Sequence, residues 1–390
     1  MTLTHESQAD TITGPAMLGA FAGTDRATAL EVISDPARFT ALETEWNDAV
    51  DRAGITHPFL RHEWLRTWWE CFGGGRRSLH VIVARRGGRI FAIAPFMREH
   101  VQMYGMPVRR IDFLQNDHTP RTDVIVVGEL EDGCRAIWQA LRDGRGNWDV
   151  LQLSRLPGDS RTRELFERLA GGDRCATGVW RGDVSPYLTL NGTWDTYLAS
   201  LSAKFRSNLR NRLSRLTKIG EPGLEVLEGA AAIEGAREDA LRLEASGWKA
   251  EAGTSIRSDP DVERFYTLLA VRATAHGWLR LLFLTAGGRR IATSYGSCYQ
   301  GRLFLFKTGY DPEYATCSPF KLLTYFAIKA AYEEGLQEVD FLGDAEPWKL
   351  EWTDTSRTHD WLYVFSRSNR AQLLHLVKFR MVPELKKWRA

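Results

Sequence analysis

The sequence lacks the motifs by which several large enzyme classes are recognised. It contains no HExxH, no GxSxG, no Walker A motif and no GxGxxG after an apolar run. Functions based on hydride transfer, a P-loop or a serine nucleophile therefore lose their usual support. Its five cysteines are far apart and form no CxxC pair, which indicates neither a disulfide framework nor a zinc site. We expect a reducing compartment, the cytoplasm, and no metal cofactor.

Long apolar runs and an excess of charge are missing as well. No run approaches the roughly 20 apolar residues that a membrane helix needs, and the N-terminus lacks the basic region of a secretory signal. Residues 1–26 are predicted to form a mobile tail. The formal net charge of +2 gives no global electrostatic reason to bind nucleic acid or a membrane, so an anionic partner must be contacted locally.

The composition is that of a soluble globular protein, with 44% apolar and 26% charged residues over 390 positions. A single core seldom grows beyond about 250 to 300 residues. The length therefore predicts two domains.

An internal repeat supports this division. The segments LHVIVARRGGR (Leu79–Arg89) and LRLLFLTAGGR (Leu279–Arg289) align without a gap, 200 positions apart. Gly-Gly between two apolar runs predicts a β-hairpin, because both central turn positions need positive φ. Two such hairpins at the same place in each half indicate a duplication.

The surroundings of the two hairpins agree with a duplication. Helices are predicted before them at 35–52 and 61–72, and at 230–247 and 261–276. After the first hairpin we expect strands at 109–114, 123–127 and 148–153 and a helix at 131–142. After the second we expect strands at 301–310 and 338–342 and a helix at 318–334. Each half is thus an α+β unit with a mixed sheet.

The predicted domains are an N-terminal domain over residues 27–190 and a C-terminal domain over 191–370. The segment 175–190 is expected to cross between them, and a C-terminal helix is predicted over 371–390.

One clear basic feature is the helix expected over Lys204–Gly220. Phe205, Leu209 and two further leucines fall on one face, basic residues occupy the rest, and no acid occurs from 196 to 220. This pattern fits a clamp for phosphates, for which arginine offers bidentate hydrogen bonds. It fits a solvated amphipathic helix equally well.

Charged residues also cluster after the strand that begins EVDFLGDAEPWKLEW (Glu338–Trp352). Asp344, Glu346 and Lys349 are crowded beyond the strand end, where α/β sites usually form. A carboxylate there could act as a base for an amine or hydroxyl, with the lysine stabilising an oxyanion. A salt-bridged turn is the alternative.

The loop LQNDHTPRTD (Leu114–Asp123) is a weaker candidate. Asp117, His118, Arg121 and Asp123 could supply a histidine base with an orienting carboxylate. Asn, Asp, Thr and Pro are also the residues of which turns are made, and we favour that interpretation. Cys317, the one tempting thiol, is expected to be structural.

Five segments together resemble the CelD/BcsL-like acyltransferases of the GNAT superfamily. They are WLRTWWECFGG, LHVIVARRGGRIFAIAPF, KFRSNLRNRLSRL, LFLFKTGYDPEYATCSPFKLL and VDFLGDAEPWKLEW. These relatives are bacterial proteins with two tandem GNAT-like domains, named for cellulose biosynthesis and related to the FemAB aminoacyltransferases. The resemblance covers roughly residues 30–370 and implies the fold of two tandem GNAT-like acyl-CoA N-acyltransferase domains.

The resemblance also implies an activity and a site. The activity would be transfer of an acyl group from acyl-CoA, with an acetyl or longer chain, to an amine or hydroxyl in cell-envelope or exopolysaccharide biosynthesis. The donor's pantetheine arm would pair with the strand LFLFKTGY. Candidate donor-binding residues are Phe306, Thr308, Gly309, Tyr310, Ser318, Phe320 and Lys321. Asp344 or Asp340 would be the base or substrate anchor and Lys349 its electrostatic partner, while Arg206, Arg210 and Trp348 would contact donor or acceptor.

The sequence departs from the family where the pyrophosphate should bind. GNAT enzymes commonly use a glycine-rich turn, and the CelD-like relatives typically have Ser-Pro-Gly where this chain has Ser318, Pro319 and Phe320. Ser318 as N-cap and Pro319 as first helical residue still predict an available helix N-terminus, to which Lys321 can add a full charge. Phe320 places a side chain where a diphosphate needs space, so we expect weak or displaced pyrophosphate binding.

Two alternative functions remain. A FemAB-like enzyme would transfer an aminoacyl group from charged tRNA and use the basic helix to contact the acceptor stem. A non-catalytic binding or scaffold protein would keep the fold without the donor site. No DNA partner and no transmembrane segment are expected.

Overall fold

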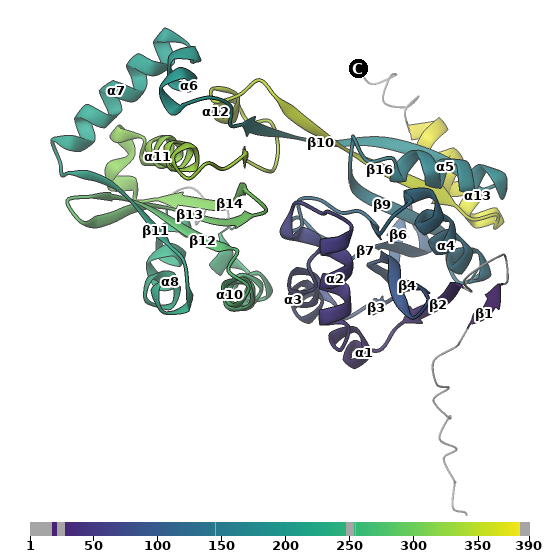
Figure 1. Cartoon of the computed structure of the whole chain (residues 1–390). Coiled ribbons are helices and arrows are strands. Elements are labelled where there is room, and N and C mark those ends of the chain that lie inside the picture. Colours follow the sequence, from purple (N-terminus) through teal and green to yellow (C-terminus); the bar gives the residue numbers. More distant parts are fainter. Residues whose placement is uncertain (1–17, 22–27, 145, 247–252, 254, 383–390) are drawn as a thin grey trace, which may run out of the picture.

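The computed structural model describes residues 18–21, 28–144, 146–246, 253 and 255–382, which form two lobes joined by long strands (Figure 1). The N-terminal lobe consists of residues up to 186 and of 356–382. Its elements are β1 (Leu18–Phe21), β2 (Thr28–Ile33), α1 (Pro36–Thr40), α2 (Glu43–Arg52), η1 (Pro58–Leu60), α3 (His62–Phe72), β3 (Arg77–Leu79), β4 (Val81–Arg86), β5 (Arg89–Ala94), β6 (Phe96–Met103), β7 (Met106–Phe113), β8 (Ile125–Val126), α4 (Leu130–Asp143), β9 (Val150–Pro157), α5 (Thr162–Gly172), most of β10 (Ala176–Thr189), β16 (Ser356–Phe365), α13 (Asn369–Leu376) and the π-helical turn η4 (Val377–Met381).

The C-terminal lobe consists of residues 187–355. Its elements are the end of β10, α6 (Trp194–Ser200), α7 (Ala203–Thr217), β11 (Pro222–Leu227), α8 (Ala230–Glu244), η2 (Ile256–Ser258), α10 (Pro260–Ala275), β12 (Leu279–Ala286), β13 (Arg289–Tyr299), β14 (Arg302–Tyr310), η3 (Pro312–Cys317), α11 (Pro319–Glu333), β15 (Glu338–Asp340) and α12 (Pro347–Leu350). None of the described helices is both long and apolar enough to cross a membrane.

The structure repeats one unit, as the aligned segments predicted. Both hairpins form, with φ of 55° and 78° at Gly87 and Gly88 and of 56° and 81° at Gly287 and Gly288. The two ladders even share a register shift at the same position, after Ala84 in one and after Leu284 in the other. Each hairpin is followed by two parallel strands connected through a helix, β7–α4–β9 and β14–α11–β15.

Within the described residues the strands form a small sheet, β1-β2-β4-β5-β8, and a large one, β11-β12-β13-β14-β15-β10-β16-β9-β7-β6-β3. The large sheet is mixed and extends through both lobes, so the prediction of an α+β fold with a mixed sheet is confirmed. The strand β10 joins the lobes because its residues Ala176–Pro186 pair with β16, whereas Tyr187–Thr189 pair with β15.

The strand β16 comes from near the end of the chain but lies beside β9 of the N-terminal lobe. No pattern in the sequence indicated this return, and the C-terminal domain was predicted to extend without interruption from residue 191 to residue 370. The domain limits at 190 and 370 stay predictions.

Helix packing fixes the faces of the C-terminal lobe. The helix α11 covers one face of β12, β13 and β14, α8 and α10 cover the other, and α6 and α7 lie outside α11 (Figure 1). The helices α3 and α10 pack together between the lobes. There the centre of the Trp64 ring lies 5.7 Å from that of Phe265, 6.4 Å from that of Trp278 and 5.4 Å from that of Phe306. One apolar core therefore continues from lobe to lobe.

Two local predictions were wrong. The single helix expected over 35–52 is two helices, because the chain bends after Thr40 and so brings Phe39 and Trp46 into one edge-to-face contact at 5.6 Å. Within the tail expected over 1–26, Leu18–Phe21 form β1 and pair with β2. The rest of that tail, and residues 383–390 of the expected C-terminal helix, lie outside the described residues.

Candidate functional site

The parallel strands β14 and β15 separate soon after they meet. They pair from Arg302 with Glu338 to Phe304 with Asp340, and β14 then continues to Tyr310 after β15 has ended. A register shift against β13 makes Phe306 an extra residue in β14, and such a bulge bends the strand and increases its twist. The opening lies at the carboxyl ends of both strands, where α/β sheets most often bind ligands.

A pocket of about 460 Å³ occupies this opening. It brings together seven of the predicted site residues: Phe306, Thr308, Gly309, Tyr310, Phe320, Trp348 and Lys349. Its wall does not include the other six, which are Asp340, Asp344, Ser318, Lys321, Arg206 and Arg210. Sequence reasoning thus found the strand, helix and turn that form the pocket, but not every side chain that faces it.

Lys349 is almost fully buried at the base of the pocket, with 5% of its surface exposed. Its Nζ donates to the carbonyl oxygens of Leu342 at 2.7 Å and Asp344 at 2.8 Å, and forms an ion pair with Glu346 at 3.1 Å. These bonds hold the turn in which Leu342 and Gly343 have φ of 52° and 57°. A left-handed conformation is costly for leucine, so Lys349 has a structural task in addition to its place in the wall.

Asp340 is fully buried and joins the two lobes. Its Oδ2 accepts from Arg121 Nη2 at 2.8 Å and from Arg357 Nη1 at 3.0 Å, and its Oδ1 accepts from the backbone N–H of Leu342. Both oxygens of this carboxylate are therefore engaged inside the protein. Burial and the nearby Arg121 charge lower the pKa of His359 to about 4, so the His359 imidazole is uncharged near neutral pH.

The two exposed carboxylates of the turn differ in position. Asp344 makes no side-chain hydrogen bond or ion pair within the described part of the chain, and it lies outside the pocket wall. Glu346 lines the pocket and accepts from Trp348 Nε1 at 3.1 Å besides pairing with Lys349. Of the two, Glu346 is the carboxylate that faces the pocket. The only indication in the sequence was that it follows Asp344 by two residues in the same charged turn.

The loop before α11, residues 311–318, is where we expected pyrophosphate to bind and is called the phosphate loop below. Its side chains are arranged differently from expectation. Ser318 occupies the N-cap position of α11 with φ of 49° and makes no side-chain capping bond. Its Oγ instead accepts from Arg212 Nε at 2.8 Å. Lys321 pairs with Glu351 and lies over the Phe205 ring at 5.2 Å, so its charge is already compensated. Phe320 packs edge-on against Trp348 at 4.5 Å and narrows the pocket.

The basic helix α7 lies beside this loop, although not through the arginines we expected. Arg206 donates to the carbonyl oxygens of Ala199 and Leu201 and so caps α6. Arg210 is exposed, and its side chain makes no hydrogen bond or ion pair within the described residues. Arg212 and Arg215 reach the loop, the latter donating to the Thr316 carbonyl at 3.3 Å. The buried Nη1 of Arg212 has no hydrogen-bond partner among the described residues.

The loop Leu114–Asp123 serves the contact between the lobes, in line with our preference for a turn. His118 stacks on Phe72 at 5.9 Å and lies 3.4 Å from the Tyr266 hydroxyl. Burial, together with the Lys307 charge, lowers the pKa of His118 to about 4, far from the value of an efficient base at neutral pH. Cys317 is buried, as expected of a structural thiol.

This geometry can now be compared with known proteins. Residues 203–350 match the acetyltransferase (GNAT) domain family. The match spans α7, the β12–β14 meander, the phosphate loop, α11 and the turn to Lys349, so it contains the whole pocket. The part of the chain in which we expected a GNAT acyltransferase domain thus matches this family. No curated protein has a significantly similar sequence.

Solved structures extend the likeness to both lobes. FemX superposes with a TM-score of 0.56 at 11% identity, covering 86% of this chain and 98% of FemX. L-PGS from Bacillus licheniformis gives 0.52 at 12% identity, covering 88% and 95% of the two chains. The C-terminal domain of a putative lysylphosphatidylglycerol synthetase from Agrobacterium fabrum gives 0.51 at 13%, covering 87% and 95%. At these identities the likeness shows the shared GNAT-type fold alone.

Proposed function

We propose that the pocket between β14 and β15 binds an acyl-CoA, with an acetyl or longer chain, and transfers its acyl group to an amine or hydroxyl. The observation that carries the proposal is the separation of the two strands beside the N-terminus of α11, with Arg212 bound to the loop before that helix. A helix N-terminus and an arginine form a suitable site for a diphosphate.

The groups of this chain would have the following roles. The backbone of β14 from Phe306 to Tyr310 would hold the pantetheine arm. The unpartnered Nη1 of Arg212 would donate to a phosphate oxygen. Glu346 would accept the proton of the attacking amine or hydroxyl, and Lys349 would hold Glu346 in place through their ion pair. Asp340 would maintain the lobe interface, and Asp344 would contact the acceptor from outside the pocket.

The finer parts of the proposal rest on the sequence resemblance to the CelD/BcsL-like family. They are an acceptor in cell-envelope or exopolysaccharide biosynthesis and a reaction in the cytoplasm. Phe320 remains the feature least favourable to the coenzyme, because its ring occupies the pocket beside Trp348. Replacing it in Phe320→Gly should therefore tighten acyl-CoA binding.

Two arginines of the same helix provide a sharp test by isothermal titration calorimetry with acetyl-CoA and longer acyl-CoAs. Arg212→Ala removes a donor to the phosphate and should weaken binding by about tenfold or more, since a hydrogen bond to a charged group contributes about 1.5–3 kcal/mol. Arg210→Ala is the matched control and should bind within about twofold of the wild type. Absence of heat with every acyl-CoA, or equal weakening in both variants, would remove the coenzyme assignment.

A second candidate is aminoacyl transfer from charged tRNA, favoured by the exposed cations of α7 such as Lys204 and Arg210. In that case Arg210→Ala should lower tRNA affinity and reduce its dependence on salt, because each neutralised phosphate releases counterions. A protein that binds neither donor, and whose role is unaffected by Glu346→Gln, would be a scaffold that has kept the fold only.

A further inference from the structure

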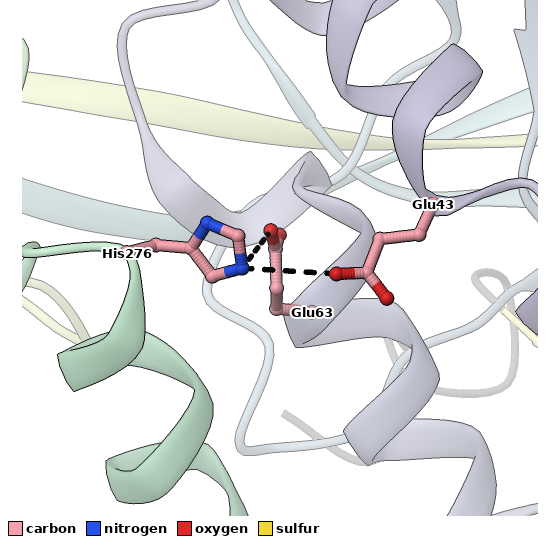
Figure 2. Close-up of side chains that lie close together, drawn as sticks. All are labelled: Glu43, Glu63 and His276. Carbon is pink, nitrogen blue, oxygen red and sulfur yellow. Dashed lines mark ion pairs between the residues drawn. The ribbon is translucent and has the colours of Figure 1, made fainter.

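A cluster of two carboxylates and an imidazole lies between the lobes, away from the pocket. Glu43 is the first residue of α2, Glu63 lies in the first turn of α3, and His276 follows the end of α10. Figure 2 shows the three side chains pointing toward one another from the two lobes. One ligand atom of each lies within 4.8 Å of the other two.

The spacing of these atoms fits a shared ion. His276 Nε2 is 3.0 Å from Glu63 Oε1 and 3.7 Å from Glu43 Oε1. Two ligands on a tetrahedral Zn²⁺, each about 2.0–2.1 Å from the metal, are about 3.3 Å apart. The two separations from His276 Nε2 lie on either side of this value.

An independent observation comes from His62, which is fully buried beside the cluster. Its Nε2 donates to the Phe39 carbonyl at 2.9 Å, which leaves the lone pair of a neutral ring on Nδ1. That Nδ1 has no hydrogen-bond partner among the described residues and lies 4.0 Å from Glu43 Oε2. A buried acceptor without a donor, facing a carboxylate oxygen of the half-buried Glu43, calls for a cation or a water between them. A ring whose other nitrogen is fixed by a carbonyl is also typical of histidines near metals.

The neighbouring cations do not compensate the cluster fully. Arg66 lies 3.4 Å from Glu43 Oε2 and Arg61 lies 3.5 Å from Glu63 Oε2. Each of these arginines is bound at 2.8 Å to another carboxylate, Glu70 or Asp51. Both arginines approach the Oε2 atoms, so the two Oε1 atoms are left to converge on His276. Asn47 Nδ2 donates to Glu63 Oε1 at 2.7 Å, the kind of second bond that orients a ligating carboxylate.

We propose that Glu43, Glu63 and His276 bind a divalent transition metal of the Zn²⁺ type and that the ion links the two lobes. The fourth position is taken by water, which hydrogen-bonds to His62 Nδ1. The ligand types, two oxygens and one imidazole nitrogen, are those that zinc accepts. Because the ligands stand at positions 43, 63 and 276, no spacing motif in the sequence could indicate the site.

Zinc alone is the probe for the test. Wild-type protein freed of metal with EDTA should bind one equivalent of Zn²⁺ in calorimetry and retain it through dialysis, as measured by mass spectrometry of the metal. His276→Gln should bind at least about tenfold more weakly. The matched control is His100→Gln, which changes another exposed histidine and should bind as the wild type does. Glu43→Gln is a second test variant, since Glu43 is only half-buried.

Thermal unfolding separates a metal site from an ordinary ion pair. Zn²⁺ should raise the unfolding temperature of the wild type and of His100→Gln but not of His276→Gln, because only a ligand bound to the native state stabilises it. No stoichiometric zinc in the wild type overturns the proposal, and so does equal binding by the two histidine variants. A stability loss in His276→Gln that is the same with EDTA and with zinc assigns an ion pair and also overturns it.

Discussion

Asp340 offers the clearest way to separate structure from catalysis in this protein. The carboxylate is fully buried and binds Arg121 at 2.8 Å and Arg357 at 3.0 Å. Removing one partner of a buried ion pair typically costs about 3–5 kcal/mol, because the remaining charge is left uncompensated. Arg357 keeps a second acid, Glu338, at 3.3 Å, so we expect Asp340→Ala to lose about 3 kcal/mol, at the lower end of that range.

The assay is urea unfolding followed by tryptophan fluorescence, with acyl transfer measured on the same preparations. Asp344→Ala is the matched control, since the exposed Asp344 should change the free energy of unfolding by less than about 0.5 kcal/mol. In the double variant Arg121→Ala/Asp340→Ala part of the loss should return, with a coupling of about 1–3 kcal/mol. Unchanged stability of Asp340→Ala would refute the structural role, and lost activity at full stability would make Asp340 a catalytic residue.

Three further predictions concern stability. Gly309→Ala should lower the free energy of unfolding in urea by about 1–3 kcal/mol, because the added Cβ would lie 2.2 Å from the Leu243 carbonyl oxygen. Gly235→Ala is the control: it has open space around it in α8 and should raise the free energy of unfolding by about 0.5–1 kcal/mol. Equal effects of the two substitutions would contradict the close contact. Lys349→Met keeps the aliphatic stem but removes the charged donor, and should lower the free energy of unfolding by about 2 kcal/mol. Unchanged stability together with lost acyl transfer would show that Lys349 acts in catalysis and has no structural role. Burial raises the pKa of Asp112 to about 6, so the native state holds a proton that the unfolded state releases near pH 4. The free energy of unfolding should therefore fall by up to about 3 kcal/mol as the pH rises from 4 to 7. If the free energy of unfolding of Asp112→Asn depends on pH in the same way as that of the wild type, this prediction is wrong.

Much of the fold could be predicted because its signals are local. The Gly-Gly turns at 87–88 and 287–288 need positive φ, and the amphipathic pattern of α7 is complete within the helix. The pocket could be predicted to the level of its elements for the same reason, since β14, the loop before α11 and the turn after β15 each carry a short local motif, and all three lie within the segment that matches the family.

The side chains of the site could not be assigned from local signals. Whether Arg206 or Arg212 meets the phosphate loop depends on how α7 is rotated against η3 and α11. Asp340 looked like a catalytic group because its partner Arg121 lies in the other lobe, 219 positions earlier in the chain. The return of β16 to the N-terminal lobe is likewise a long-range pairing. Alternating apolar and polar residues can indicate a strand, but they do not indicate which other strand it pairs with.

The duplication raises the question of which lobe would bind the proposed donor, and the charges at the two helix N-termini favour the C-terminal lobe. The N-terminal lobe has a pocket of about 540 Å³ beside Leu130, at the start of the helix α4 that corresponds to α11. The first turn of α4 carries Glu131 and Asp132 after Glu129 at the N-cap. A helix N-terminus contributes only about half a positive charge, so these carboxylates reverse its sign and repel a diphosphate. The first turn of α11 has no acid, and Arg212 adds a full positive charge to the loop before it. Of these two pockets, the one at α11 therefore agrees better with the coenzyme A binding that we propose.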